Sequence, residues 1–359
     1  MATRKDIANR AGVSVSVVSR ALNNSGYVDN DKKEKILKIA EELGYYPHPV
    51  AMSLQKRRTK QILFYCKDLQ NSFNIEMYQG MMETAKDRGY MVVFNGSLDF
   101  NSIKETMIDG IIMPNENAAQ WYLESSGKNY FLPVVTASYG NPVCFSKAAP
   151  RVEIDMYKAT KIAVQYLRDN GHEKIALGMP YEYNSANARM YGYLEELRPV
   201  LKEDIKRYVL GIHKKDMGED ERLLRFIEEQ TGNNFTVEES FYGKGEVAAQ
   251  LFLERNLDAT AILCFNDVFA FGVCNQFIRM GVRVPEDISI MGFDGTFARR
   301  YTSPLMTTVD LSAKKQGGKC AELLLDMLEG KKVKRVIHLP VKIMPGESVK
   351  NLHTGRSPK

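Results

Sequence analysis

Several features that define whole classes of protein are missing from this sequence of 359 residues. It has no run of 18 apolar residues, and no apolar stretch follows its basic amino terminus, which argues against a membrane span and a signal peptide. The motifs GxxxxGK[ST], GxGxxG, GxSxG and HExxH are also missing. We therefore expect a cytoplasmic protein without membrane association, and the sequence gives no argument for catalysis or for a bound cofactor.

Cysteine is scarce as well. The five cysteines are odd in number and widely scattered, with no CxxC pair and no histidine at metal-binding spacing: Cys66, Cys144, Cys264, Cys274 and Cys320. This pattern predicts reduced core residues rather than a disulfide framework or a metal site.

Positive charge, by contrast, is concentrated at one end. Residues 1–60 hold twelve Lys and Arg against six Asp and Glu, a net charge of +6, while the whole chain carries +5, so the remainder is close to neutral at about −1. A basic head on a nearly neutral body is typical of a nucleic-acid-binding segment joined to a domain with another task.

The first residues predict a helix-turn-helix. Thr3 begins the pattern Thr-x-x-Asp, which is typical of a helix N-cap, and a first helix is expected over residues 4–9. Residues 10–13 interrupt it, and Ser14 can cap a second helix that extends to Leu22.

The second helix has two distinct faces. At 100° per residue, one arc of roughly 140° holds short side chains and one arginine, and the opposite side is apolar. The outward residues are Val15, Ser16, Ser19 and Arg20, and the inward ones are Val17, Val18 and Ala21. Short hydroxyl side chains and an arginine suit contact with base edges in the major groove. The alternative is an ordinary amphipathic helix in a three-helix bundle.

A third helix is expected over residues 31–43, followed by a hinge. Residues 50–56 can form a short helix, but one of fewer than about 12 residues is marginal in water, so we expect it to form only against DNA and a partner hinge. Leu54 is predicted to wedge between base pairs in the minor groove, the alternative being a plain linker residue. The basic residues beside it are predicted to pass phosphates: Lys56, Arg57, Arg58 and Lys60.

From Gln61 onward, strand-like and helix-like segments alternate. Strands are expected over residues 62–66, 90–94, 108–113, 174–178, 259–265 and 288–293, and helices over 75–88, 186–197, 244–255 and 268–280. Such alternation predicts parallel sheets flanked by helices.

Ligands of parallel sheets bind beyond the carboxyl ends of the strands. Asn266 and Asp267 follow one predicted strand, and Asp294 follows another. We predict that Asn266 and Asp294 bind a small polyhydroxylated ligand and that Asp267 caps the following helix; helix or turn capping is the alternative for all three.

Several motifs resemble those of the lactose/galactose-repressor (LacI/GalR) family, in order and spacing. They are TRKDIANRAGVSVSVVSRALN in the head, YYPHPVAMSL in the hinge, and GHEKIAL, FNDVFAFGV, GVRVPEDISIMGFD and SPLMTTVD in the body. The resemblance implies a transcriptional repressor, a homodimer on a pseudo-palindromic double-stranded DNA operator. It also implies a two-lobed α/β body of the periplasmic-binding-protein type I fold, with a small-molecule effector, a sugar or sugar phosphate, between the lobes.

The resemblance and the residue patterns together nominate two sets of contacts. The DNA contacts are Thr3, Val15, Ser16, Ser19, Arg20, Asn23, Leu54, Lys56 and Arg57, of which Thr3 and Asn23 contact or position the DNA backbone. The effector contacts are Phe73, Asn74, Ser138, Arg189, Asn266 and Asp294, where Ser138 aligns with a position that often carries an acid. Phe73 as a core residue and Arg189 as a surface charge are the alternatives.

The resemblance also implies a division of the chain in which it crosses between the lobes three times. We expect a head over residues 1–46, a hinge over 47–60, a first lobe over 61–158 and 293–322, and a second lobe over 159–292 and 323–359. The sequence departs from the family pattern at His48, Met52 and Gly346, and by a shorter segment over residues 95–110.

Other functions fit parts of this sequence. A regulator that responds to a nucleobase or to a phosphoprotein corepressor remains open, and the body alone would suit a solute-binding protein. An enzyme that uses Asp155, Asp267 or Asp294 as acid and base is a further alternative, although no paired-carboxylate or nucleophile motif supports it.

Overall fold

The protein divides into two compact units, Met1–Thr59 and Lys60–Lys359, which are described in turn. The computed structural model describes residues 2–23, 25–45, 58–66, 71–96, 103, 106–126, 132–140, 149–180, 187–211 and 240–353. The expected hinge helix over residues 50–56 lies outside these ranges, as do His48, Met52 and most of the segment 97–105. Within the described ranges, no helix combines the length and apolar character needed to cross a bilayer.

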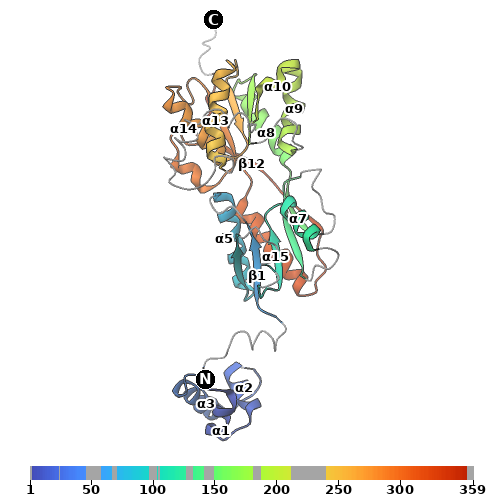
Figure 1. Cartoon of the computed structure of the whole chain (residues 1–359), viewed down its shortest axis with the longest axis vertical. Helices are drawn as coiled ribbons and strands as arrows, with labels where there is room; N and C mark the ends of the chain where they lie inside the picture. Colours follow the sequence, from blue (N-terminus) through green and yellow to red (C-terminus); the bar gives the residue numbers. More distant parts are fainter. Residues whose placement is uncertain are drawn as a thin grey trace. The chain divides into compact units, whose positions relative to one another are not determined.

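The first unit is a three-helix head, as predicted, made of α1 (Arg4–Ala11), α2 (Val15–Asn23) and α3 (Asn30–Glu42) (Figure 1). α1 begins with a capping box, in which the Thr3 side chain accepts from the Asp6 backbone N–H and the Asp6 carboxylate accepts from the Thr3 N–H at 2.8 Å. The head has its own small core, which includes Ile7, Val18, Ala21, Ile36 and Ile39. The predicted packing side of α2 is therefore confirmed for Val18 and Ala21.

The second unit contains two sheets, each with its own helices, which we call the first and second lobes. The sheet of the first lobe is parallel throughout, in the order β11-β5-β4-β3-β1-β2. Its strands are β1 (Gln61–Tyr65), β2 (Met91–Asn95), β3 (Gly110–Met113), β4 (Val134–Ser138), β5 (Arg151–Ile154) and β11 (Val336–Leu339). Its helices are α5 (Ser72–Asp87), α7 (Glu116–Ser126) and α15 (Ala313–Leu328).

The second lobe has the order β12-β10-β9-β8-β6-β7, in which only β12 runs antiparallel to its neighbour. Its strands are β6 (Ile175–Met179), β7 (Val209–Gly211), β8 (Ala261–Cys264), β9 (Ser289–Asp294), β10 (Thr307–Asp310) and β12 (Lys342–Met344). Its longer helices are α8 (Met156–Asp169), α9 (Ala188–Leu201), α13 (Phe241–Glu254) and α14 (Asp267–Arg279). Figure 1 shows α13 and α14 on one side of this sheet and α8 and α9 on the other. Short turns η1 (Lys202–Asp204), α10 (Ile205–Tyr208) and η2 (Phe297–Tyr301) complete it.

Glycines let one helix pair in each lobe pack very closely. A Cβ at Gly80 of α5 would lie 1.9 Å from the carbonyl oxygen of Lys314 in α15. A Cβ at Gly245 of α13 would lie 2.1 Å from the carbonyl oxygen of Phe269 in α14. Both distances are far below any van der Waals contact, so only glycine permits these backbone approaches.

Sheet membership corrects the expected lobe boundaries. β10 was assigned to the first lobe by the range 293–322, but it pairs with β9 of the second lobe. β11 was assigned to the second lobe by the range 323–359, but it pairs with β5 of the first. The chain still crosses three times: after β5, after β10 and between β11 and β12. The boundaries failed because short apolar strands look alike in sequence, whereas membership depends on pairing.

Candidate DNA interface and effector site

The outward face of α2 is exposed, as its periodicity predicts. Val15 is 45% exposed, Ser16 and Arg20 are also exposed, and Ser19 is half-buried. The Arg20 Nε donates to the Ser16 carbonyl oxygen at 3.4 Å, which lays the arginine along the helix surface. This face therefore presents hydroxyl groups and one cation that no packing interaction covers within the head.

Two predicted backbone contacts are partly occupied by contacts within the head. The Thr3 hydroxyl donates to the Asp6 carboxylate at 2.7 Å and completes the cap of α1. These hydrogen bonds from the Thr3 hydroxyl and N–H lower the pKa of Asp6 below its usual value. Asn23 is half-buried, and its Nδ2 donates to Ser19 Oγ at 3.4 Å. Leu54, Lys56 and Arg57 lie outside the described residues.

In the body, Asp294 stands at the end of β9 in an unusual conformation. It is 6% exposed, its φ is +117°, and its Oδ2 is buried without a hydrogen-bond partner among the described residues. Burial and the neighbouring Asp267 charge raise the pKa of Asp294 well above its usual value. A strained backbone and an unsatisfied buried carboxylate oxygen are costly features that recur at functional sites.

Asn266 and Asp267 exchange the roles that the sequence predicted for capping. The N-cap of α14 is Asn266, whose Oδ1 accepts from the Phe269 N–H at 2.9 Å. Asp267 instead lies fully buried, where it accepts from the Thr308 hydroxyl at 2.6 Å and from the Gly295 N–H at 3.0 Å. Burial raises the pKa of Asp267 to about 7. The prediction that Asp267 caps the helix is wrong, because its neighbour already occupies the cap.

Arg189 is a buried residue rather than a surface charge. It is 7% exposed in the first turn of α9, where Asn187 caps the helix by accepting the Arg189 N–H at 2.9 Å. The centre of the guanidinium lies 4.2 Å from the ring centroid of Phe265 and 5.4 Å from that of Phe293. Stacking on these rings orients the guanidinium while leaving its edge available for hydrogen bonds.

Phe73 and Asn74 are in the first two turns of α5, on the first lobe. Phe73 is 4% exposed and belongs to the large core of the body, which bears out the packing alternative for this residue. Its ring meets that of Tyr139 edge to face, with centroids 6.1 Å apart. Asn74 is half-buried.

Ser138 is held by carboxylates of its own lobe. Its hydroxyl lies 3.1 Å from Glu116 Oε1 and 3.2 Å from Glu153 Oε2, and Glu153 also accepts from Arg151 Nε at 2.8 Å. The next residue, Tyr139, was missed by the sequence argument. Its ring is partly exposed beyond the end of β4, and its N–H donates to Glu116 at 2.6 Å.

Residues of both lobes come together around Asp294. Burial raises the pKa of the Tyr139 phenol well above its usual value, and the charges of Glu116 and Asp294 raise it further. Two hydrogen bonds join the lobes nearby: the Ser72 and Thr296 hydroxyls lie 2.8 Å apart and are buried, and the Phe297 N–H donates to Glu76 at 2.8 Å. Burial raises the pKa of Glu76.

The facing ends of the lobes thus place an arginine, acids and aromatic rings together. Among the described residues, no group of three or more His, Cys, Asp or Glu side chains is arranged to hold a metal ion. The arrangement suits a small ligand with hydroxyl groups and an apolar face, bound by hydrogen bonds and ring contacts.

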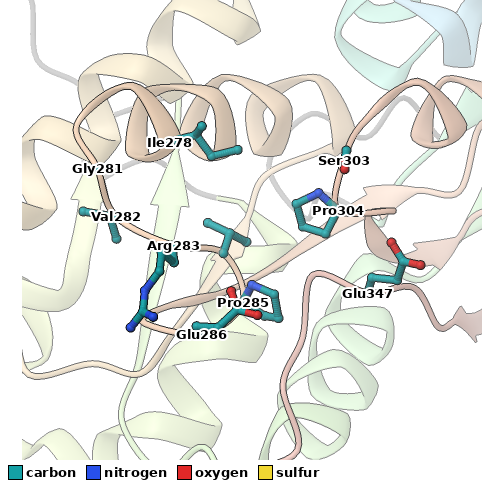
Figure 2. A pocket seen from close by; sticks show the side chains of 10 residues that line it. Ile278, Gly281, Val282, Arg283, Pro285, Glu286, Ser303, Pro304 and Glu347 are labelled. Carbon is teal, nitrogen blue, oxygen red and sulfur yellow. The ribbon is translucent and has the colours of Figure 1, made fainter.

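A separate groove of about 630 Å³ lies elsewhere on the second lobe (Figure 2). Its lining comes from the end of α14, the segment before β9, the segment before β10, and Glu347. Figure 2 shows Ile278, Pro285 and Pro304 forming apolar walls, with Arg283 and Glu286 at the rim. None of the predicted effector residues lines it, because they lie at the opposite, carboxyl ends of the strands.

Family models match the head and the body of this chain separately. "Bacterial regulatory proteins, lacI family" matches residues 3–48, and "Periplasmic binding proteins and sugar binding domain of LacI family" matches residues 59–224. "Periplasmic binding protein-like domain" matches residues 164–349, about half of the chain.

Similar proteins cover nearly the whole chain. The HTH-type transcriptional repressor CytR of Escherichia coli is 30% identical over 340 residues, which are 92% of this chain and 91% of CytR. The HTH-type transcriptional repressor PurR of Vibrio atlanticus is 28% identical, over 98% of this chain and 100% of PurR.

Solved structures share the fold. The lac repressor dimer bound to operator and the anti-inducer ONPF has a TM-score of 0.72 at 22% identity, covering 97% of this chain and 99% of the repressor chain. The complex of the transcriptional regulator CelR with cellobiose has a TM-score of 0.59 at 21% identity, covering 97% and 100% of the two chains.

Proposed function

Because the chain belongs to the LacI family of bacterial DNA-binding transcriptional regulators, we propose that it is a repressor controlled by a sugar held between its two lobes. It binds a pseudo-palindromic operator as a homodimer. Its site of action is the cytoplasm, where bacterial DNA lies.

The DNA half of this proposal is supported by the face of α2. Arg20 and Ser16 are exposed side by side on it, and Val15 offers a small apolar surface. An arginine matches the two acceptors of a guanine, and a valine methyl suits contact with a thymine methyl. Two copies of this face, related by a two-fold axis, would read two half-sites of one operator.

The effector half is supported above all by Asp294. Its buried Oδ2 lacks a hydrogen bond among the described residues, so a ligand hydroxyl that donates to this atom would satisfy it. Arg189, stacked on Phe265, supplies donors for a hydroxyl or ring oxygen of the same ligand. Tyr139 and Phe73 supply ring surfaces from the other lobe.

The charges favour an unphosphorylated sugar within the class of sugars and sugar phosphates. The carboxylates of Asp294 and Glu76 act on each other's surroundings, and the buried Asp267 adds to the negative potential. A phosphate dianion would meet this potential, whereas a neutral polyol donates hydrogen bonds to it. Two fold relatives were solved with sugars: CelR with cellobiose, and a LacI-family regulator of Enterococcus faecium with ribose, at 21% identity and a TM-score of 0.63.

One observation favours a nucleobase or nucleoside as the second candidate. The Phe241 and Phe265 rings are stacked with centroids 5.4 Å apart, and Phe73 pairs with Tyr139. Aromatic surfaces of this kind also bind planar heterocycles.

The proposed control is allosteric. A ligand that prefers one arrangement of the lobes shifts the body toward that arrangement, and in the dimer this changes the spacing of the two hinges and their fit to DNA. Linkage between two such sites is typically about 1–3 kcal/mol, a change in affinity of several-fold to a hundredfold.

A thermal-shift screen tests the effector half. Matched pairs of a neutral sugar and its phosphate ester are compared with nucleosides and nucleobases on the full chain. At a hundredfold excess over Kd, a ligand stabilises the protein by about 2.7 kcal/mol. The proposal expects a neutral sugar to stabilise the chain and to change its operator affinity. Stabilisation by phosphate esters alone would contradict it, and stabilisation by nucleosides alone would select the second candidate.

A further inference from the structure

Arg4, in the first turn of α1, connects three parts of the head. Its Nε donates to the Tyr45 hydroxyl at 3.1 Å, and its Nη1 donates to Ser19 Oγ at 3.3 Å. Asn23 Nδ2 donates to the same Ser19 oxygen at 3.4 Å. The guanidinium therefore lies beside the outward face of α2, where the sequence analysis assigned no role to it.

The direction of these hydrogen bonds decides what the hydroxyl groups can still do. A hydroxyl has one hydrogen to donate and two lone pairs to accept with. Ser19 Oγ already accepts two N–H groups, so its remaining capacity is to donate. The Tyr45 oxygen accepts from Arg4 and likewise keeps its own hydrogen. Each hydroxyl is thus oriented as a donor toward an acceptor outside the cluster.

The charge of Arg4 is not neutralised within the head. Among the residues that the structure describes there, Arg4 forms no ion pair with a carboxylate, whereas Arg10 of the same helix pairs with Glu42 at 2.9 Å. Arg4 is half-buried, so part of its guanidinium is accessible. A cluster of donors with an uncompensated positive charge calls for an anionic acceptor with several oxygens. On a DNA duplex, that acceptor is a backbone phosphate.

We propose that Arg4, Ser19 and Tyr45 form a phosphate-binding site at the edge of the DNA-reading face, an inference that rests on the proposed DNA-binding function. Ser19 is then a phosphate ligand rather than a reader of bases. Base reading falls to Val15, Ser16 and Arg20 of the same helix. A phosphate held by groups from α1, α2 and the end of the head fixes the angle at which α2 enters the groove, without carrying sequence information.

Salt dependence distinguishes this site from a base contact. The duplex enriched by the wild-type full chain from a randomised pool is compared with a scrambled duplex over a series of salt concentrations. Arg4→Leu should lower the slope of log K against log salt by about 0.9, the value for one phosphate contact. It should weaken binding to both duplexes by about tenfold at fixed salt, with the selected base preferences unchanged.

Two further variants serve as controls. Arg10→Leu removes the same charge from the same helix, but from the ion pair with Glu42, and should leave the slope unchanged. Tyr45→Phe keeps the ring that packs against the head core and removes only the hydroxyl donor, so it should weaken both duplexes several-fold. Thermal unfolding of each variant checks that the head is intact. Should Arg4→Leu unfold the head, Tyr45→Phe decides.

Each result has a definite meaning. An altered base preference in Arg4→Leu would show that Arg4 reads a base, which overturns the site. An unchanged slope, an equal loss in Arg10→Leu, or unchanged affinity in Tyr45→Phe would overturn it too. If the wild-type chain enriched no duplex at all, the proposed function would fail and this inference with it, an outcome distinct from a normal wild-type motif with an unaltered variant.

Discussion

The head and the body use charge in opposite ways. In the head, Arg20 and Ser16 are exposed on a small helix bundle, and the helices are held by a core that these residues do not enter. In the body, Arg189 and Asp294 are 7% and 6% exposed, and their charges are desolvated. A large polyanion is bound by surface charge, whereas a small polar ligand is selected by buried groups whose hydrogen bonds it completes. The body therefore carries its functional cost in its stability and the head does not.

The largest expected effect separates the stability of the body from that of the head. In Gly80→Ala, the new Cβ would meet the Lys314 carbonyl oxygen at 1.9 Å, so α5 and α15 must move apart. We expect the body to lose about 3 kcal/mol or more in urea unfolding, because overpacking against backbone cannot be relieved by a rotamer change. The matched control is Gly330→Ala, which meets no atom within 4 Å and costs about 1 kcal/mol through its φ of +76°. Equal losses would contradict the packing account.

Arg20→Ala should damage DNA recognition without touching the body. Loss of a guanine contact is worth about 1–3 kcal/mol, so affinity for the selected duplex should fall roughly tenfold to a hundredfold while affinity for scrambled DNA changes far less. Fluorescence anisotropy on both duplexes measures this. Effector binding, followed by calorimetry, should be unchanged. A uniform loss on both duplexes would mean that Arg20 contacts only phosphate.

Asp294→Asn should do the reverse. The amide removes the charge that the ligand hydroxyls complete, so the effect of the ligand on operator affinity, expected at about 1–3 kcal/mol in the wild type, should largely vanish. Operator affinity without ligand should stay within about twofold of the wild type. The measurement is operator anisotropy with and without the sugar found by screening. A normal response in Asp294→Asn would remove this residue from the effector site.

The smallest expected effect is a change in pH dependence confined to the body. Because the pKa of Asp294 is raised in the folded state, that state binds more protons than the unfolded chain above pH 3.8, and the contribution of this group to stability falls as pH rises. Asp294→Asn removes this fall, so the stability of the variant relative to the wild type should increase from pH 4 upward. Denaturant unfolding at several pH values measures the difference. A difference that stays flat would show that Asp294 titrates normally.

The same contrast explains how much could be predicted from the sequence. The exposed face of α2 follows from a 3.6-residue period, which is local, and it was predicted correctly. Lobe membership depends on which strands pair, so β10 and β11 were placed in the wrong lobes. The rule of looking beyond strand ends identified Asp294, and the same rule applied to β4 would have found Tyr139 beside Ser138.

Two other residues needed the structure. Nothing in the order Asn266-Asp267 says which of them caps α14, because both residue types are good N-caps, and only the geometry shows Asp267 turned toward Thr308 and Gly295. Gly346 departs from the family pattern, and the structure gives a reason: a Cβ there would lie 2.3 Å from the Leu305 carbonyl oxygen. Contacts between distant segments decide both cases.

The most direct test of the whole account is selection of DNA by the full chain. Purified protein is incubated with randomised duplexes at low ionic strength, and the retained sequences are read after several rounds. The account predicts a motif with two-fold symmetry whose half-sites are about one helical turn apart, or a multiple of it. Retention of duplexes without any shared symmetric motif would contradict the claim that paired heads read an operator.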